Sequence, residues 1–145
     1  FGAPLAFPLA IAPTGAVGIG RPGADVMLAR AAKAAGVPYT LATPATATIE
    51  EVAEQAGGRL WFQLYVLRNR AFRDQLVARA AAAGYEALLV TVDLPVGGKR
   101  ERDLRNGFSP PFRPSWRNAG DVWRKPAWLL DLALSLFPSR TRESS

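Results

Sequence analysis

The sequence predicts an α/β fold built on a parallel sheet. Short and largely apolar runs, each predicted to form a strand, cover residues 5–12, 38–43, 60–66 and 87–93. Helical patterns separate these runs, and strands joined through helices lie parallel with right-handed crossovers. From residue 94 onward, Gly, Pro, Arg and Trp replace the alternation. The pattern therefore fits either a small open α/β sheet or half of a (β/α)8 barrel.

The first strand is expected to end at Pro13-Thr14-Gly15, because proline and glycine favour a turn. A loop rich in Gly and Pro follows it. An Ala-rich helix is then predicted over residues 24–35, with Gly36 closing its C-terminus. The second predicted strand comes directly after this helix.

Capping residues mark the starts of the two remaining helices. Thr48 and Glu51 have the spacing of a capping box, in which a hydroxyl and a carboxylate bind free amides of the first turn. We expect this helix to end at Gly57-Gly58. After the third strand, Asn69 is predicted to cap a helix that runs to residue 83, where Gly84 is the C-cap.

Composition restricts the chemistry of this chain. Its 145 residues include no cysteine and no histidine, which excludes disulfides, thiolate metal sites and the commonest general base. The formal net charge is +6, and residues 99–145 hold 10 Lys/Arg against 5 Asp/Glu. The first residue is not Met, and neither a signal peptide nor a bilayer-spanning run is recognisable. We expect an excerpt of a longer protein.

Polar residues interrupt two of the apolar runs near their carboxyl ends, where α/β folds bind ligands. They are Gln63, Tyr65, Thr91 and Asp93. The spacing of two within each pair directs both side chains to one face of a strand. An amide suits a heterocycle edge that carries both N–H and C=O groups, and a phenol suits a substrate oxygen. A core Gln with satisfied hydrogen bonds and a Tyr reaching solvent are an equally good interpretation.

A basic loop follows the fourth strand at residues 95–103. An arginine in it would bind a carboxylate through two parallel hydrogen bonds, although such loops are more often simply solvated. The glycines at positions 15, 18 and 20 do not form a dinucleotide-binding GxGxxG motif. No acidic residue ends the second strand either, so a Rossmann fold is rejected.

Taken together, these stretches resemble the FMN-dependent α-hydroxy-acid oxidases and dehydrogenases, and most closely their membrane-associated bacterial mandelate and lactate dehydrogenases. The order and spacing fit from near residue 1 to about residue 135. The matching stretches are Ala12-Pro13-Thr14-Gly15, Leu28-Ala29-Arg30-Ala31-Ala32, Thr48-Ile49-Glu50-Glu51-Val52, Trp61-Phe62-Gln63-Leu64-Tyr65-Val66, Thr91-Val92-Asp93 and Arg100-Glu101-Arg102-Asp103.

The resemblance implies a partial TIM (β/α)8 barrel of about four βα units, with FMN across its C-terminal mouth. Residues 1–106 would form this half-barrel, and residues 107–145 an irregular basic-aromatic tail. Cofactor contacts are implied for Pro13, Thr14, Gly15, Gln63 and Thr91. Substrate contacts are implied for Tyr65 and Arg100, while Asp93 keeps a structural role.

The implied activity is FMN-dependent oxidation of a 2-hydroxy acid such as lactate, mandelate or glycolate to the 2-oxo acid. Two departures bear on it. Ala42, followed by Thr43, replaces a serine that touches the flavin in this family, so a hydrogen bond is lost unless Thr43 or water supplies it. The family's histidine base, from a later strand, is missing. The isolated chain is therefore predicted to be inactive, and the alternative is a non-catalytic remnant or a flavin- or membrane-binding module.

Residues 108–137 interleave aromatics with Arg and Lys beside a short apolar stretch, which suits the surface of an anionic membrane. A loop helix packed on the barrel and a nucleic-acid stacking groove are the other interpretations. The resemblance favours the membrane, because membrane-bound relatives carry their insertion after the same strand. We therefore expect a cytoplasmic protein that is peripheral on the inner face of the plasma membrane, without nucleic acid, and a homo-oligomer when full length.

Overall fold

The structure, a computed structural model, describes residues 4–92 and 124–136. The chain divides into two compact units, Phe1–Asp93 and Leu94–Ser145. The first unit contains a sheet and its helices, and the second contributes one described helix. The boundary predicted near residue 106 lies outside the described residues.

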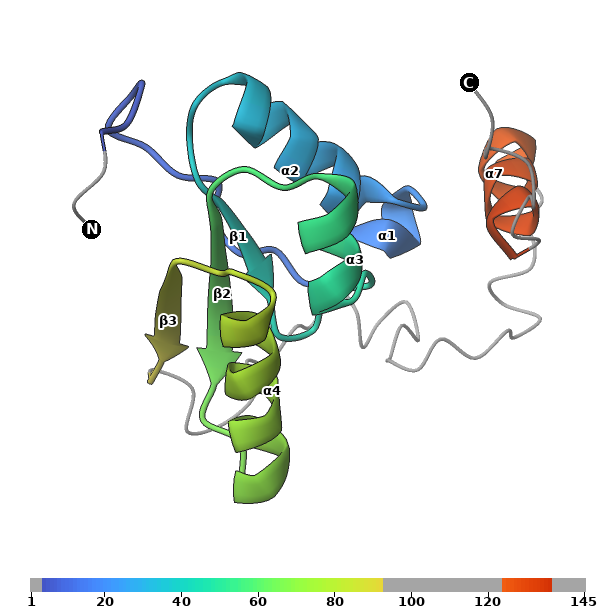
Figure 1. Ribbon diagram of the computed structural model, residues 1–145. Helices are drawn as coiled ribbons and strands as arrows, with labels where there is room; N and C mark the ends of the chain where they lie inside the picture. The colour runs from blue at the N-terminus through green and yellow to red at the C-terminus, as the bar shows by residue number, and fades with distance from the viewer. Residues whose placement is uncertain (1–3, 93–123, 137–145) are drawn as a thin grey trace. The chain divides into compact units, whose positions relative to one another are not determined.

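A parallel sheet organises the first unit (Figure 1). Its strands are β1 (Tyr39–Ala42), β2 (Leu60–Tyr65) and β3 (Ala87–Thr91). They lie in the order β1-β2-β3, and both pairings are parallel. The α/β class and the parallel strands predicted from the alternation are confirmed.

The connecting helices cover one face of this sheet. They are α2 (Ala24–Ala34) before β1, α3 (Ile49–Gln55) between β1 and β2, and α4 (Arg70–Ala82) between β2 and β3. The strands supply Tyr39, Leu41, Leu60, Phe62 and Leu64 to the core that these helices close. Because alternate residues of a strand face opposite sides, the remaining strand residues, Gln63 and Thr91 among them, face away from the helices.

The predicted caps are confirmed at both helix starts. The Thr48 hydroxyl accepts a hydrogen bond from the Glu51 amide at 3.1 Å, and the Glu51 carboxylate accepts one from the Thr48 amide at 3.4 Å. Asn69 Oδ1 accepts a bond from the Phe72 amide at 3.1 Å. Gly84 takes a left-handed conformation, with φ of 80°, directly after α4 and its C-cap.

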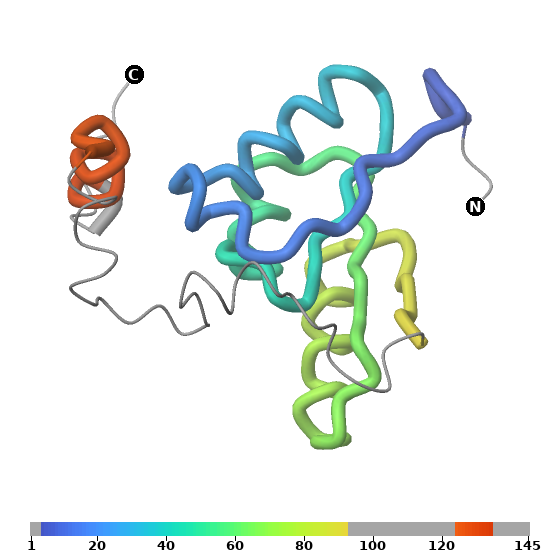
Figure 2. Tube along the Cα trace, turned by 180° about the vertical axis from the view of Figure 1, so that it is seen from behind, coloured from blue at the N-terminus to red at the C-terminus, as the bar shows by residue number. Residues whose placement is uncertain are grey.

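The strand predicted over residues 5–12 is wrong in extent. Only Ile11 pairs with the sheet, through an isolated parallel bridge to Tyr39. The chain bends at residues 6–8, where the Leu9 amide turns back to the Phe7 carbonyl at 2.8 Å. Pro8 has no N–H to donate to a neighbouring strand, which explains the bend. Figure 2 shows this segment passing beside β1.

The outer strand β3 carries apolar side chains on its surface. Leu88 and Val90 are 42% and 51% exposed, although they lie on the face that the helices cover elsewhere. Val92, just beyond the strand, is 81% exposed. Among the described strands β3 therefore has one paired edge, toward β2.

The second unit contains α7 (Pro126–Leu136), which confirms that the apolar stretch of the tail is helical. Leu130 and Leu134 are 64% and 71% exposed on it. Arg124 and Lys125 precede the helix directly. Within the described residues, no helix has the length and hydropathy needed to cross a bilayer.

A bidentate ion pair ties α3 to α4. Arg79 Nε donates to Glu50 Oε1 and Arg79 Nη2 donates to Glu50 Oε2, both at 2.7 Å. The hydrogen bonds from Arg79 lower the pKa of Glu50 from 4.5 to about 2, and a backbone hydrogen bond makes a smaller contribution in the same direction. The same partner raises the pKa of Arg79.

This pKa shift predicts how stability depends on pH. Because the pKa of Glu50 is lower in the folded chain, its carboxylate stabilises the fold above pH 4.5, and this contribution is lost as the pH falls toward about 2. The Glu50→Gln variant keeps the size of the side chain but does not titrate. We expect the free energy of unfolding of the wild type to fall relative to that of Glu50→Gln over this pH range, measured by urea unfolding. Parallel pH profiles for the two proteins would contradict the assignment.

Candidate functional site

The carboxyl ends of the three strands bring the predicted polar residues together. Ala42 pairs with Gln63 across β1 and β2, and Tyr65 pairs with Thr91 across β2 and β3. Partners in a parallel register face the same side of the sheet, so these residues share the face opposite the helices. Ligands of parallel α/β folds bind at this end of the strands.

Gln63 is the centre of a hydrogen-bond chain that crosses all three strands. The residue is 3% exposed. Gln63 Oε1 accepts a hydrogen bond from the Thr43 amide at 3.0 Å, and Gln63 Nε2 donates to Thr91 Oγ1 at 2.8 Å. A backbone amide can only donate, so it determines that the amide oxygen of Gln63 faces β1 and its nitrogen faces β3.

This direction decides what the site offers to a ligand. Thr91 Oγ1 acts as an acceptor toward Gln63, so its own O–H is the donor that it presents onward. A second N–H of the Gln63 amide is also a donor. Hydrogen bonds in such a chain strengthen one another. The end of the chain is therefore suited to the acceptor atoms of a ligand, such as carbonyl oxygens or ring nitrogens.

The hydroxyl of Thr43 is used inside the fold. It donates to the Gln63 carbonyl at 2.6 Å and accepts a bond from the Tyr65 amide at 3.2 Å. The side chain thus continues the hydrogen bonding between β1 and β2 beyond the last residue of β1. In this geometry the single proton of the Thr43 hydroxyl is used inside the fold, in its bond to the Gln63 carbonyl.

The loop at Pro13-Thr14-Gly15 lies against the segment that follows β1. All three residues are exposed. The Ala16 amide donates to the Pro44 carbonyl at 2.9 Å. A Cβ at Gly15 would lie 2.8 Å from Pro44 Cγ, closer than real Cβ atoms approach, so this position requires glycine.

Asp25, which no pattern in the sequence singled out, is completely buried near the start of α2. It accepts hydrogen bonds from Tyr39, Thr46 and Ala47. Burial raises the pKa of the Tyr39 phenol, and the neighbouring Asp25 carboxylate raises it further. The phenol therefore stays protonated and donates. An acidic residue in the first turn of a helix is common, and the partners of Asp25 lie 14 to 22 residues away, so the sequence contained no signal for this cluster.

The remaining predicted residues are placed as follows. Tyr65 is partly buried beside Thr91 on the same face as Gln63. Asp93 and Arg100 lie outside the described residues. Residues 4–92 and 124–136 hold no cluster of three or more acidic residues that would suit a metal ion.

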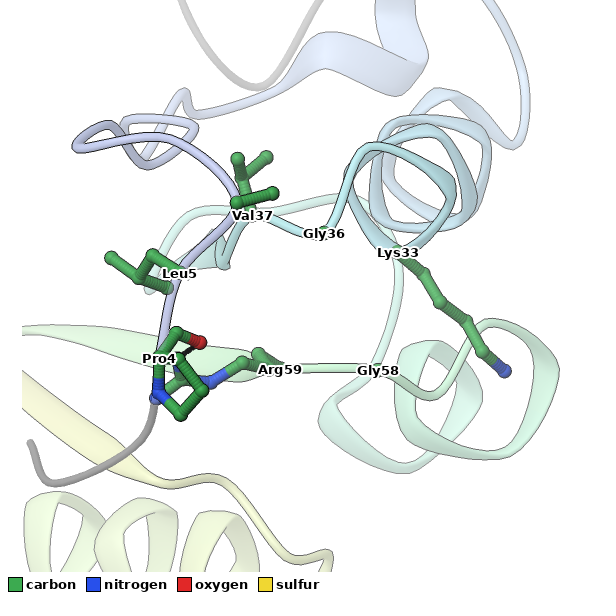
Figure 3. Close-up of a pocket in the computed structure, with 8 residues that line it drawn as sticks. Pro4, Leu5, Lys33, Gly36, Val37, Gly58 and Arg59 are labelled. Carbon is green, nitrogen blue, oxygen red and sulfur yellow. Dashed lines mark hydrogen bonds between the residues drawn. The ribbon is translucent and has the colours of Figure 1, made fainter.

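A cavity of about 440 Å³ lies at the opposite end of the sheet, where β1 and β2 begin (Figure 3). It is bounded by residues 4–6, by Gly36 and by Gly58. Its two cations are already bound: Lys33 Nζ donates to the Ala56 carbonyl at 3.1 Å, and Arg59 pairs with Glu86 at 2.8 Å. Lys33 also extends away from the cavity. The polar residues at the carboxyl ends of the strands therefore remain the candidate site.

Comparison with known proteins identifies the family of this chain. The sequence profile of the FMN-dependent dehydrogenases matches residues 1–144. The chain belongs to this family. It is 42% identical over 134 residues to an L-lactate dehydrogenase of Vibrio parahaemolyticus and 45% identical over 134 residues to one of Stenotrophomonas maltophilia. Each match covers 92% of this chain and 35% of the relative, so the chain spans about a third of the length of these relatives.

Solved structures of the same family share the fold. A monotopic membrane protein, (S)-mandelate dehydrogenase, superposes with a TM-score of 0.82 and 39% identity, covering 94% of this chain and 38% of that protein. A mandelate oxidase variant with a C4a-OH-FMN adduct gives a TM-score of 0.70 and 46% identity, covering 77% of this chain and 33% of the oxidase. These neighbours are flavin dehydrogenases and oxidases with TIM-barrel folds, and this chain corresponds to part of such a barrel. FMN is the cofactor of the family.

The two roles of the Thr43 hydroxyl predict a stability effect. Thr43→Val keeps the shape of the side chain but leaves the Tyr65 amide and the Gln63 carbonyl without this partner. We expect it to lower the free energy of unfolding by about 1–3 kcal/mol, the range for half-buried polar groups left unsatisfied, in urea unfolding. Thr43→Ser keeps the hydroxyl and is the matched control. Equal stability of the two variants would show that the Thr43 hydroxyl does not contribute as assigned.

Proposed function

We propose that this chain forms the flavin-facing half of the active site of an FMN-dependent 2-hydroxy-acid dehydrogenase. The hydrogen-bond chain from Thr43 through Gln63 to Thr91 carries the proposal. It ends in donors at the ligand-binding end of the sheet, and the pyrimidine edge of a flavin offers two carbonyl oxygens and the ring nitrogen N1 as acceptors beside its one N–H. The donor set therefore fits the cofactor of the family.

Five residues are assigned to the cofactor in this proposal: Gln63 and Thr91 at the pyrimidine edge, and the backbone of Pro13, Thr14 and Gly15 against the ring. The glycine at position 15 supports the second assignment, because the loop can lie close to Pro44 only without a side chain there. FMN, when bound, supplies a two-electron acceptor for oxidation of the hydroxyl-bearing carbon.

Tyr65 and Arg100 are proposed to bind the substrate. The Tyr65 phenol would hydrogen-bond an oxygen of the 2-hydroxy acid, and the Arg100 guanidinium would bind its carboxylate. L-Lactate and mandelate are the substrates named for the relatives, and we propose the same substrate class for the whole protein. The sequence has no histidine to remove the hydroxyl proton, so we propose that the 145-residue chain binds flavin without oxidising these acids.

The proposal is tested by titrating the chain with FMN and following flavin fluorescence. Thr91→Val removes the terminal hydroxyl but keeps the shape of the side chain, and we expect a dissociation constant about two- to tenfold higher, as for one lost hydrogen bond. Thr91→Ser retains the hydroxyl and should bind nearly as the wild type. Equal affinities for Thr91→Val and Thr91→Ser would remove Thr91 from the site.

The same samples decide between a half-site and a non-catalytic remnant. With saturating FMN, L-lactate or mandelate and an artificial electron acceptor, we expect no turnover by the 145-residue chain. Turnover would contradict the inactive half-site and require a base other than histidine. Failure of the wild type to bind FMN would favour a remnant that has lost the flavin function.

A second proposed property is peripheral membrane contact through residues 108–137, with the whole protein at the inner face of the plasma membrane as a homo-oligomer. Two observations support the contact. The exposed leucines of α7 follow the basic pair Arg124 and Lys125. The structural relative covering 94% of this chain is a monotopic membrane protein. Apolar side chains beside cations suit an anionic headgroup layer.

Vesicle co-sedimentation tests the membrane contact. We expect the chain to sediment with vesicles that contain anionic phospholipid and to bind less to purely zwitterionic vesicles, because its cations contribute to the affinity. A variant with Leu130→Asp and Leu134→Asp should lose most of the binding. Undiminished binding of this double variant would exclude α7 as the contact.

A further inference from the structure

The buried carboxylate of Asp25 joins three parts of the first unit. Asp25 Oδ1 accepts a hydrogen bond from the Tyr39 hydroxyl of β1 at 2.9 Å. Asp25 Oδ2 accepts one from Thr46 Oγ1 at 2.7 Å and two from the Thr46 and Ala47 amides, each at 3.2 Å. No cation lies within salt-bridge distance of it in the described residues. The carboxylate is therefore held by neutral donors, and hydrogen bonds of this kind offset the cost of its burial.

Thr46 passes this anchoring on to the loop that carries Pro13-Thr14-Gly15. While its hydroxyl donates to Asp25, the same oxygen accepts a hydrogen bond from the Gly18 amide at 3.1 Å. A Cβ at Gly18 would lie in collision with Thr46 Oγ1, so the contact also depends on the missing side chain. Gly18 belongs to α1 (Val17–Gly20), the short helix directly after the loop.

The backbone between the loop and α1 needs such an anchor. Ala16 has a φ of 58°, which places it in the left-handed region. This conformation costs a residue with a Cβ free energy, and it persists only where the surroundings hold it. The Ala16 amide is bound to the Pro44 carbonyl at 2.9 Å, two residues before Thr46. Both contacts that hold the loop therefore come from the segment that Asp25 binds.

We propose that Asp25 and Thr46 are positioning residues that hold the loop at residues 13–16 in its flavin-binding conformation through the Gly18 amide. The relay runs from the Asp25 carboxylate to the Thr46 hydroxyl and from there to α1. It rests on the proposed function for its link to flavin, whereas the link from Thr46 to the loop stands on geometry alone. Neither residue touches the cofactor in this proposal.

Thr46→Ala and Thr46→Ser are the decisive pair, because they differ only by the Oγ atom of the relay. Hydrogen exchange of the backbone amides, measured on the full 145-residue chain without FMN, reports the loop directly. We expect the amides of Ala16 and Gly18 to exchange about three- to tenfold faster in Thr46→Ala than in Thr46→Ser. Equal exchange in the two variants overturns the relay.

Tyr39→Phe separates positioning from general stability. It removes a hydrogen bond to the same carboxylate from the side of β1 and leaves Thr46 untouched. We expect a lower Tm but loop exchange close to that of the wild type. Loop exchange that rises in Tyr39→Phe as much as in Thr46→Ala would show that the loop follows overall stability, and that outcome overturns the proposal.

Asp25→Ala tests the origin of the relay. If Thr46 acts through Asp25, the double variant Asp25→Ala with Thr46→Ala should exchange its loop amides at the same rate as Asp25→Ala alone. Additive effects would show that Thr46 holds the loop without Asp25. Should Asp25→Ala not fold, the comparison of Thr46→Ala with Thr46→Ser still decides whether the Thr46 oxygen positions the loop.

FMN titration provides the functional readout. We expect a dissociation constant several-fold higher for Thr46→Ala than for Thr46→Ser. Faster loop exchange with equal FMN affinities would overturn the role in flavin binding while leaving the relay intact. If the wild type binds no FMN, the proposed function fails, and the exchange experiment still tests the relay.

Discussion

The parallel register of β1, β2 and β3 is the constraint from which the site follows. Parallel strands end at the same edge, so residues 20 to 28 positions apart in the sequence meet there. The side-chain amide of Gln63 is hydrogen-bonded to residues on both sides of β2, Thr43 and Thr91. The Thr43 hydroxyl is in turn hydrogen-bonded to the Gln63 carbonyl and the Tyr65 amide of β2. The same bonds that hold the strand ends together also give the edge its donor character. In the proposed function, one set of contacts therefore serves both the fold and the recognition of the flavin.

Much of this arrangement is readable in the sequence because it depends on local chemistry. Thr48, Asn69 and Gly84 act within three or four residues of themselves, and their patterns predicted the helix ends correctly. Gln63 and Thr91 were conspicuous because polar residues are unusual in buried parallel strands. Their hydrogen bond to each other was not predictable, since it depends on the register between strands.

The failures have an equally physical origin. Residues 5–12 are apolar enough for a strand, but their pairing depends on where Pro8 bends the chain. Asp25 is an ordinary first-turn residue in the sequence and becomes exceptional only when Tyr39 and Thr46 close around it. Which way the oxygen and nitrogen of the Gln63 side-chain amide point was also not predictable, because the backbone amide of Thr43, 20 residues away, decides it. Long-range contacts of single polar groups leave no periodic signal in the sequence.

The order of the strands bears on how this unit can form during synthesis. Each strand pairs with the strand that immediately precedes it in the chain, so no strand has to wait for a distant partner. The sheet can therefore grow from the amino end as the ribosome releases one strand–helix unit after another. Among the described strands, β3 with its exposed Leu88 and Val90 is the outer edge of this sheet, and an exposed strand edge is a template for pairing with another chain.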